Sequence, residues 1–128
     1  MDNIQVIEYT PTNNAWKYKL SSYIDKLEKN STVGVFCYHD LIAFNVFLYL
    51  TNAGYKIPEQ VGIVGYDDLP ISQIFNLTTF SYSYDEIVKQ SIACLIELIE
   101  NFSVEQKNIQ IQTILISRAS TNLKRENP

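Results

Sequence analysis

Residues 61–68 constrain the fold more than any other part of the chain. Their sequence, VGIVGYDD, passes from an apolar, β-branched stretch without a polar face directly into two carboxylates. A strand that is hydrophobic throughout is typical of a parallel sheet with both faces covered. In open α/β sheets, ligands bind just beyond the carboxyl ends of such strands. The sequence therefore predicts a buried strand that ends at a ligand cleft, with Asp67 and Asp68 at its edge.

A second segment repeats this arrangement. Residues 33–37 (VGVFC) are apolar and lead through His39 and Asp40 into a helical stretch over residues 41–53. Asp40 suits the N-cap of this helix, and Gly54 suits its C-terminal end. Because parallel strands place their carboxyl ends at one edge of a sheet, we expect the polar groups of both segments to meet there.

Composition and charge narrow the class of protein. A chain of 128 residues with 46% hydrophobic and 19% charged side chains is expected to fold as one domain with a real core. It has no apolar run of the roughly 20 residues that span a bilayer, and its first residues do not resemble a secretory signal. We therefore expect a cytoplasmic protein with reduced cysteines and no membrane partner. The net charge of −4, with scattered Lys and Arg, predicts no nucleic-acid surface on this chain.

Strand and helix signals alternate along the chain, which favours βα units around a parallel sheet. Ser83 and Glu86 form a capping box at the start of the longest helix. The expected elements are a strand at residues 4–9, a helix with Trp16, Leu20, Tyr23, Ile24 and Leu27 on one face, a single turn at 69–76, an extended segment at 77–82, a helix at 84–102, a loop at 101–108, a last strand at 109–116 and a frayed tail at 118–128.

Five ordered blocks carry a family resemblance. They are VFCYHDLIA at residues 35–43, AGYKIPEQV at 53–61, VGYDD at 64–68, LTT at 77–79 and LISRAST at 115–121. In these blocks the chain resembles the C-terminal part of the effector domain of the lactose/galactose repressor (LacI/GalR) family, which is similar to periplasmic sugar-binding proteins. The resemblance implies an α/β fold: a parallel-sheet, three-layer lobe of a type I periplasmic-binding-protein-like domain that lacks most of the N-terminal lobe.

The resemblance also divides the chain. Residues 1–78 and 109–121 correspond to the C-terminal lobe, and residues 79–108 to a crossing segment and a helix that would pack on the other lobe. That lobe and the DNA-reading head have no counterpart in this sequence. An apolar helix face without its partner favours self-association, so we expect an oligomer, with exchange of this helix between copies as one route.

Four residues are candidates for effector binding. A carboxylate at a strand end accepts hydrogen bonds from two vicinal sugar hydroxyls, and the family's aspartate that matches Asp67 does so. His39 replaces the amide side chain usual in the family, which keeps a hydrogen-bonding group but changes its shape and charge. Tyr82 and Tyr84 match cleft positions, where aromatic rings stack on the apolar face of a sugar. A purely structural role is the alternative for each, and we expect one for Asp68.

The resemblance implies a function. It points to the effector-sensing domain of a bacterial transcriptional regulator or repressor, in which a small effector, most naturally a sugar, closes two lobes and changes how an upstream head binds operator DNA. The helix expected over residues 41–53 has little polar surface, so we expect it to pack on a second surface besides its own sheet. Members of the family pair their subunits partly through this helix. Phe44 and Phe75 are therefore our candidates for a homodimer surface.

Two other classes of function stay open at this level. A periplasmic-type sugar-binding protein of a transporter shares the same architecture, and a protein-interaction domain that has lost its ligand is the third possibility. Catalysis is not expected, because the single histidine cannot build a multi-histidine metal site and the sequence has no glycine-rich phosphate loop. We expect no catalytic residue, no metal and no cofactor.

Overall fold

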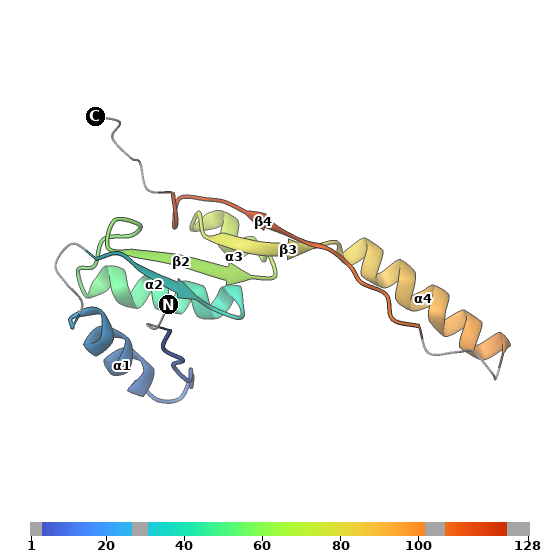
Figure 1. Ribbon diagram of the computed structural model, residues 1–128, viewed down its shortest axis with the longest axis horizontal. Coiled ribbons are helices and arrows are strands. Elements are labelled where there is room, and N and C mark those ends of the chain that lie inside the picture. Colours follow the sequence, from blue (N-terminus) through green and yellow to red (C-terminus); the bar gives the residue numbers. More distant parts are fainter. Residues whose placement is uncertain (1–3, 27–30, 102–106, 123–128) are drawn as a thin grey trace.

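The structure, a computed structural model, describes residues 4–26, 31–101 and 107–122. It is built around a four-stranded sheet in the order β1-β2-β3-β4 (Figure 1). The strands are β1 (Val33–Phe36), β2 (Val61–Tyr66), β3 (Thr78–Tyr82) and β4 (Thr113–Ile116), and the helices are α1 (Ala15–Ile24), α2 (Asp40–Asn52), α3 (Pro70–Ile74) and α4 (Tyr84–Glu100). Strands β1, β2 and β3 are parallel, whereas β4 is antiparallel to β3. The predicted α/β fold with a mainly parallel sheet is confirmed.

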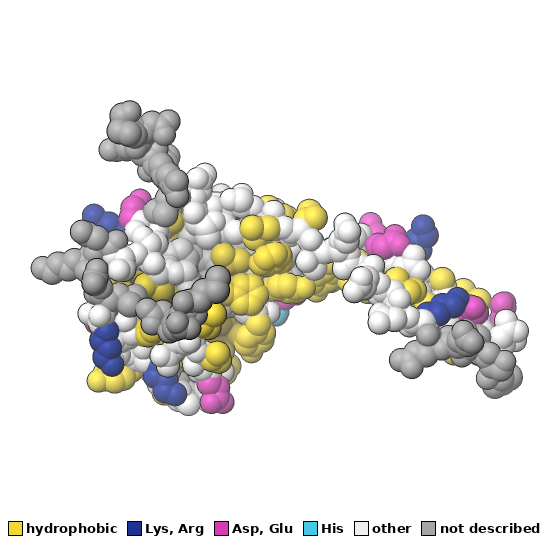
Figure 2. Space-filling view, viewed as in Figure 1, with side chains coloured by type: hydrophobic (Ala, Val, Ile, Leu, Met, Phe, Trp, Pro, Cys, Tyr) yellow, Lys and Arg dark blue, Asp and Glu magenta, His cyan; other side chains and the backbone are white. Residues whose placement is uncertain are grey.

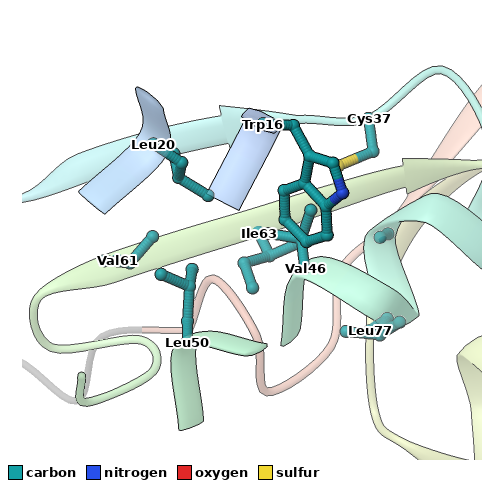
Figure 3. Close-up of a cluster of buried hydrophobic side chains, with 9 residues drawn as sticks. Trp16, Leu20, Cys37, Val46, Leu50, Val61, Ile63 and Leu77 are labelled. Carbon is teal, nitrogen blue, oxygen red and sulfur yellow. The ribbon is translucent and has the colours of Figure 1, made fainter. Parts of the chain in front are cut away.

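The hydrophobic core lies between one face of the sheet and helices α1 and α2. Val61 and Ile63 on β2 are fully buried against Val46 and Leu50 of α2 (Figure 3). Trp16 of α1 extends this cluster and packs edge to face against Tyr49 of α2, with ring centroids 5.5 Å apart. Burial of large apolar side chains is the main stabilising term of such a domain.

The opposite face of the sheet is not covered, although the sequence predicted a sheet with both faces covered. Burial alternates along β2, so that Gly62, Val64 and Tyr66 are only half-buried. Among the described residues no helix lies over this face, and the expected three layers are represented by two. A strand therefore reads as uniformly apolar even though its second face has no helix on it within the described part of the chain.

The first predicted strand is not formed. Residues 4–9 are extended but unpaired, and a groove of about 690 Å³ lies between them and β1. Ile7 and Tyr9 pack on the core, whereas Ile4 and Val6 point to solvent. Backbone hydrogen bonds make a strand, and the groove separates this segment from the edge strand β1, so the two form no such bonds. Apolar alternation alone was therefore a misleading signal here.

The C-terminal part also corrects two predictions. The strand expected at residues 109–116 is limited to Thr113–Ile116, and residues 118–122 are not frayed. Ser120 is buried: its hydroxyl donates to the Ile63 carbonyl at 2.6 Å and accepts from the Thr78 amide at 2.8 Å. The backbone of Ser120 adds a bond from the Ile63 amide at 3.0 Å. This segment therefore holds β2 and β3 together. Leu27 and residues 102–106 and 123–128 lie outside the described residues.

Helix α4 leaves the rest of the molecule. It extends to one side beyond β3 and β4, with only the returning chain alongside it (Figure 1). Ser83 caps it as predicted, because its hydroxyl accepts from the Glu86 amide at 3.2 Å. None of its residues is buried. The helix is thus well started by its sequence but has no packing partner in the described structure.

We predict that Ser120→Ala lowers the free energy of unfolding by about 1–3 kcal/mol, because it leaves a buried amide and a buried carbonyl each without this hydrogen-bond partner. Urea denaturation followed by circular dichroism measures the change. Ser117→Ala is the matched control, since Ser117 is exposed and lies three residues away. Equal stability of both variants would contradict the role assigned to Ser120.

Candidate functional site

The carboxyl ends of β1, β2 and β3 meet at one edge of the sheet and bring together all four predicted site residues. The Tyr82 hydroxyl donates to Asp67 Oδ1 at 3.1 Å and lies 3.2 Å from the Tyr84 hydroxyl. His39 Nε2 lies 3.4 Å from Asp67 Oδ2. We call these four residues the polar cluster. Their proximity agrees with the sequence prediction, whereas their role in ligand binding stays a prediction.

Asp67 is the centre of this cluster. Its φ of 102° lies in a region that side chains other than glycine rarely adopt, which marks a strained position of the kind found at functional sites. Its amide donates to the Phe80 carbonyl at 2.9 Å, which fixes the backbone. Each carboxylate oxygen has two lone pairs and contacts one donor of the polar cluster. One acceptor position on each oxygen is therefore available to a ligand.

His39 is both the N-cap of α2 and a member of the polar cluster. Its Nδ1 accepts from the Leu41 amide at 3.2 Å, so the neutral ring carries its proton on Nε2. That nitrogen lies 3.4 Å from Asp67 Oδ2. The structure corrects the prediction that Asp40 is the cap: Asp40 is the first residue of the helix, and its side chain turns inward.

The buried Asp40 carboxylate holds together the elements that carry the polar cluster. Its Oδ1 accepts from the Thr79 hydroxyl at 2.6 Å, and its Oδ2 accepts from the Leu69 amide at 2.7 Å. Gly65 makes room for it, because a Cβ at that position would lie 2.1 Å from Oδ1. Asp40 thereby joins α2 to β3 and to the loop after β2. A glycine inside an otherwise β-branched strand was the sequence signal for this close approach.

Asp68 was expected to cap the turn that follows it, but the N-cap of α3 is Leu69, and the Asp68 side chain pairs instead with a residue far along the chain. Arg118 Nη2 donates to Asp68 Oδ1 at 2.7 Å, and the two side chains are largely shielded from water. Arg118 Nη1 donates to the Ser72 hydroxyl at 3.0 Å and to the Leu77 carbonyl at 2.9 Å. Sequence reasoning missed Arg118, because an ion pair across 50 residues leaves no local pattern.

Two shifted pKa values describe the chemistry near this edge. Hydrogen bonding to Tyr84, loss of solvation and the Asp67 carboxylate all raise the pKa of Tyr82, so this phenol is a neutral donor at physiological pH. Burial, with a smaller contribution from the Asp40 charge, raises the pKa of Cys37 to about 12. A thiol must ionise to act as a nucleophile or a metal ligand. Cys37 therefore behaves as a core residue.

The predicted dimer residues form a second candidate surface on α2 and α3. Phe44 and Phe75 pack against each other, with ring centroids 4.5 Å apart. Beside them Leu41 and Ile74 are 50% and 70% exposed. We call these four residues the α2–α3 surface. Its apolar character agrees with the prediction, and its role in pairing stays a prediction.

Within the described residues, no three or more His, Cys, Asp and Glu side chains gather closely enough to hold a metal ion. In the same part of the chain, no helix combines the length and the apolar character needed to cross a membrane.

Comparison with known proteins places this geometry in a family. Residues 3–121 match the periplasmic binding protein-like domain, which is nearly the whole chain. The chain belongs to this family. Together with the relatives named below, this match confirms the resemblance to the effector domains of LacI-type regulators.

Individual relatives of this periplasmic-binding-protein-like chain are transcriptional regulators. It is 26% identical over 106 residues to the HTH-type transcriptional repressor PurR of Aliivibrio fischeri, covering 78% of this chain and 32% of that protein. It is 31% identical over 88 residues to the ribose operon repressor of Escherichia coli, covering 67% and 27%. A LacI family regulator from Enterococcus faecalis, solved with bound ribose, has a TM-score of 0.70 and 31% identity, covering 88% and 42%. The chain spans about a third of the length of the curated relatives.

We predict that Gly65→Ala lowers the free energy of unfolding by about 1–3 kcal/mol, because the new methyl group must displace the Asp40 carboxylate from its two donors. Chemical denaturation measures the loss. Gly34→Ala on β1 is the control: a Cβ there meets nothing within 4 Å, so stability should be unchanged or slightly higher. A Gly65→Ala protein as stable as this control would show that the close approach is unimportant.

Proposed function

We propose that this chain is the effector-sensing part of a LacI-type bacterial transcriptional regulator and that its effector is a sugar. The observation that carries the proposal is the polar cluster: a strained carboxylate at the carboxyl end of a parallel strand, with His39 and Tyr82 in contact with its two oxygens. The named relatives, which are repressors and regulators, favour this reading over a transport protein.

The polar cluster has the groups that bind a polyhydroxylated ligand. Asp67 offers one free acceptor position on each oxygen, and two vicinal hydroxyls can occupy them. His39 Nε2 and the Tyr82 hydroxyl contact the same two oxygens and so hold the carboxylate in place for a ligand. The rings of Tyr82 and Tyr84, whose centroids are 4.8 Å apart, provide apolar area for the carbon face of a sugar.

A neutral sugar fits this charge pattern. The cluster contains one carboxylate, one imidazole and two phenols, and it presents more acceptors and neutral donors than cations. The Enterococcus faecalis regulator was solved with ribose, which makes a pentose the first ligand to test. Because His39 stands where the family usually carries an amide that binds effector, we propose that His39 contacts the effector in its place.

Sensing would then act through the arrangement of subunits. A ligand shifts a conformational equilibrium only by its difference in affinity between the two states. In this proposal the sugar favours a closed arrangement of two lobes, and pairing through the α2–α3 surface passes the change to an upstream DNA-binding head that this sequence does not contain. A protein that acts on operator DNA works in the cytoplasm.

We predict that ribose or a related sugar binds this chain and that Asp67→Ala weakens binding about 10- to 100-fold, the cost of losing a charge-assisted hydrogen bond. Isothermal titration with pentoses, hexoses and disaccharides measures the affinity, and circular dichroism verifies folding. Glu59→Ala, which removes an exposed carboxylate just before β2, is the control. Sugar binding that survives in Asp67→Ala, or no binding by the unaltered chain, would refute the proposal.

We also predict that the double variant Leu41→Glu/Ile74→Glu loses contact through the α2–α3 surface, because it places two charges among exposed apolar side chains. The Phe44–Phe75 pair is left intact, so the fold should be retained. Sedimentation equilibrium should give a smaller mass for the variant than for the unaltered chain. An unchanged mass would place subunit pairing elsewhere.

A further inference from the structure

Arg118 contacts the chain before, within and after the short helix α3. Its Nη2 donates to Asp68 Oδ1 at 2.7 Å, and its Nη1 donates to the Ser72 hydroxyl at 3.0 Å and to the Leu77 carbonyl at 2.9 Å. We call these three contacts the Arg118 clamp. We propose that the clamp makes α3 move as one unit with the turn that carries Asp67, which makes Arg118 a positioning residue for effector sensing.

The unit held by the clamp joins two surfaces described above. The turn at its start carries Asp67, the centre of the polar cluster, and α3 ends at Ile74, which belongs to the α2–α3 surface. An effector that changes the position of Asp67 would therefore change the position of Ile74. The part of the clamp in sensing rests on the proposed sugar site, whereas the link between Asp67 and Ile74 exists without a ligand.

Turns with positive φ bound this unit on both sides. Asp67 and Asp68 have φ values of 102° and 51° before α3, and Asn76 has a φ of 51° after it. Residues other than glycine rarely adopt such values, so contacts with their neighbours must hold them there. The helix between these turns has only five residues and is too short to be stable by itself. Its position is therefore set by contacts with other parts of the chain.

The guanidinium makes the clamp a rigid link. Its donors lie in one plane with fixed directions, so the acceptors on Asp68, Ser72 and Leu77 keep one arrangement relative to each other. The side chains of Arg118 and Asp68 are 15% and 18% exposed, and Ser72 is fully buried. Hydrogen bonds to charged groups are strong where water is largely excluded. A displacement of Asp68 therefore displaces α3 with it.

At its far end α3 packs against α2. Phe75, the C-cap of α3, contacts the rings of Phe44 and Phe47, with centroids 4.5 Å and 6.0 Å apart. Ile74 beside it is 70% exposed. Close-packed side chains transmit a displacement because little free space is left to absorb it. Ile74 therefore reports the position of α3 from within the α2–α3 surface.

The link is tested first without ligand, by methyl NMR of Ile74 in the full chain. Asp67→Asn removes a charge and keeps the shape of the side chain, and we expect it to shift the Ile74 signal. In an Arg118→Lys background the same substitution should lose most of this effect, because an ammonium group can pair with Asp68 but cannot span the clamp. Ser72→Ala keeps the Asp68–Arg118 pair and is a second background with the same expected loss.

The matched control background is Lys19→Arg, which exchanges the same two cationic residues at an exposed position on α1. There Asp67→Asn should shift Ile74 as much as in the unaltered chain, and circular dichroism verifies that every variant is folded. A purely structural Arg118 would make Arg118→Lys less stable but leave the Ile74 shift unchanged. A shift that survives in both clamp backgrounds, or no shift on Asp67→Asn, would overturn the clamp.

Ribose then connects the clamp with sensing. At saturation it should move the Ile74 signal in the unaltered chain and in Lys19→Arg. In Arg118→Lys most of this movement should be lost although isothermal titration still detects binding, because the clamp contacts Asp68, Ser72 and Leu77. Binding without movement of Ile74 in the unaltered chain would overturn the role of the clamp in sensing. No binding of ribose or any other sugar, with the ligand-free result as expected, would instead overturn the proposed sugar site.

Discussion

The buried carboxylate of Asp40 is the interaction on which the functional edge of this protein depends. It sits at the start of α2, receives the Thr79 hydroxyl of β3 and the amide of Leu69, and occupies the space that Gly65 leaves on β2. A charge without exposure to water is stable only when its hydrogen bonds are made. The carboxylate therefore holds α2, β2 and β3 in one arrangement, and that arrangement brings His39 and Asp67 together.

Hydrogen bonds and an ion pair connect the C-terminal segment to the same strands. Ser120 bonds to β2 and β3, and Arg118 pairs with Asp68 at the end of β2. Asp67 and Asp68 are adjacent in sequence but differ in their contacts: Asp68 pairs with Arg118, whereas Asp67 contacts His39 and Tyr82, and we propose that it binds the ligand. Backbone strain at Asp67 is maintained because its neighbours on both sides are held.

Outside this edge, several apolar surfaces of the described structure are exposed (Figure 2). The sheet has helices on one face, α4 projects with its apolar stripe exposed, and residues 4–9 lie across a groove from β1. Exposed apolar surfaces of this kind mark sites of interaction. The curated relatives are about three times as long as this chain.

The sequence by itself determined the sheet and the location of the candidate site. Short apolar segments at residues 33–37 and 61–66 predicted parallel strands, and the polar residues after them predicted the edge where Asp67 and His39 meet. The capping box at Ser83 correctly started α4. These signals are local. Hydrophobic periodicity, secondary-structure propensity and capping residues can all be recognised within a stretch of about ten residues.

Only the tertiary structure decided how the segments are used. Residues 4–9 have a strand-like pattern, yet a groove separates them from the edge strand β1 and they do not pair with it. His39 caps α2 because the Asp40 side chain turns inward and accepts hydrogen bonds from residues 29 and 39 positions away. Arg118 and Ser120 read as a polar tail, but their partners on β2 and β3 order them. Contacts between distant residues depend on how the whole chain folds, and no local pattern encodes them.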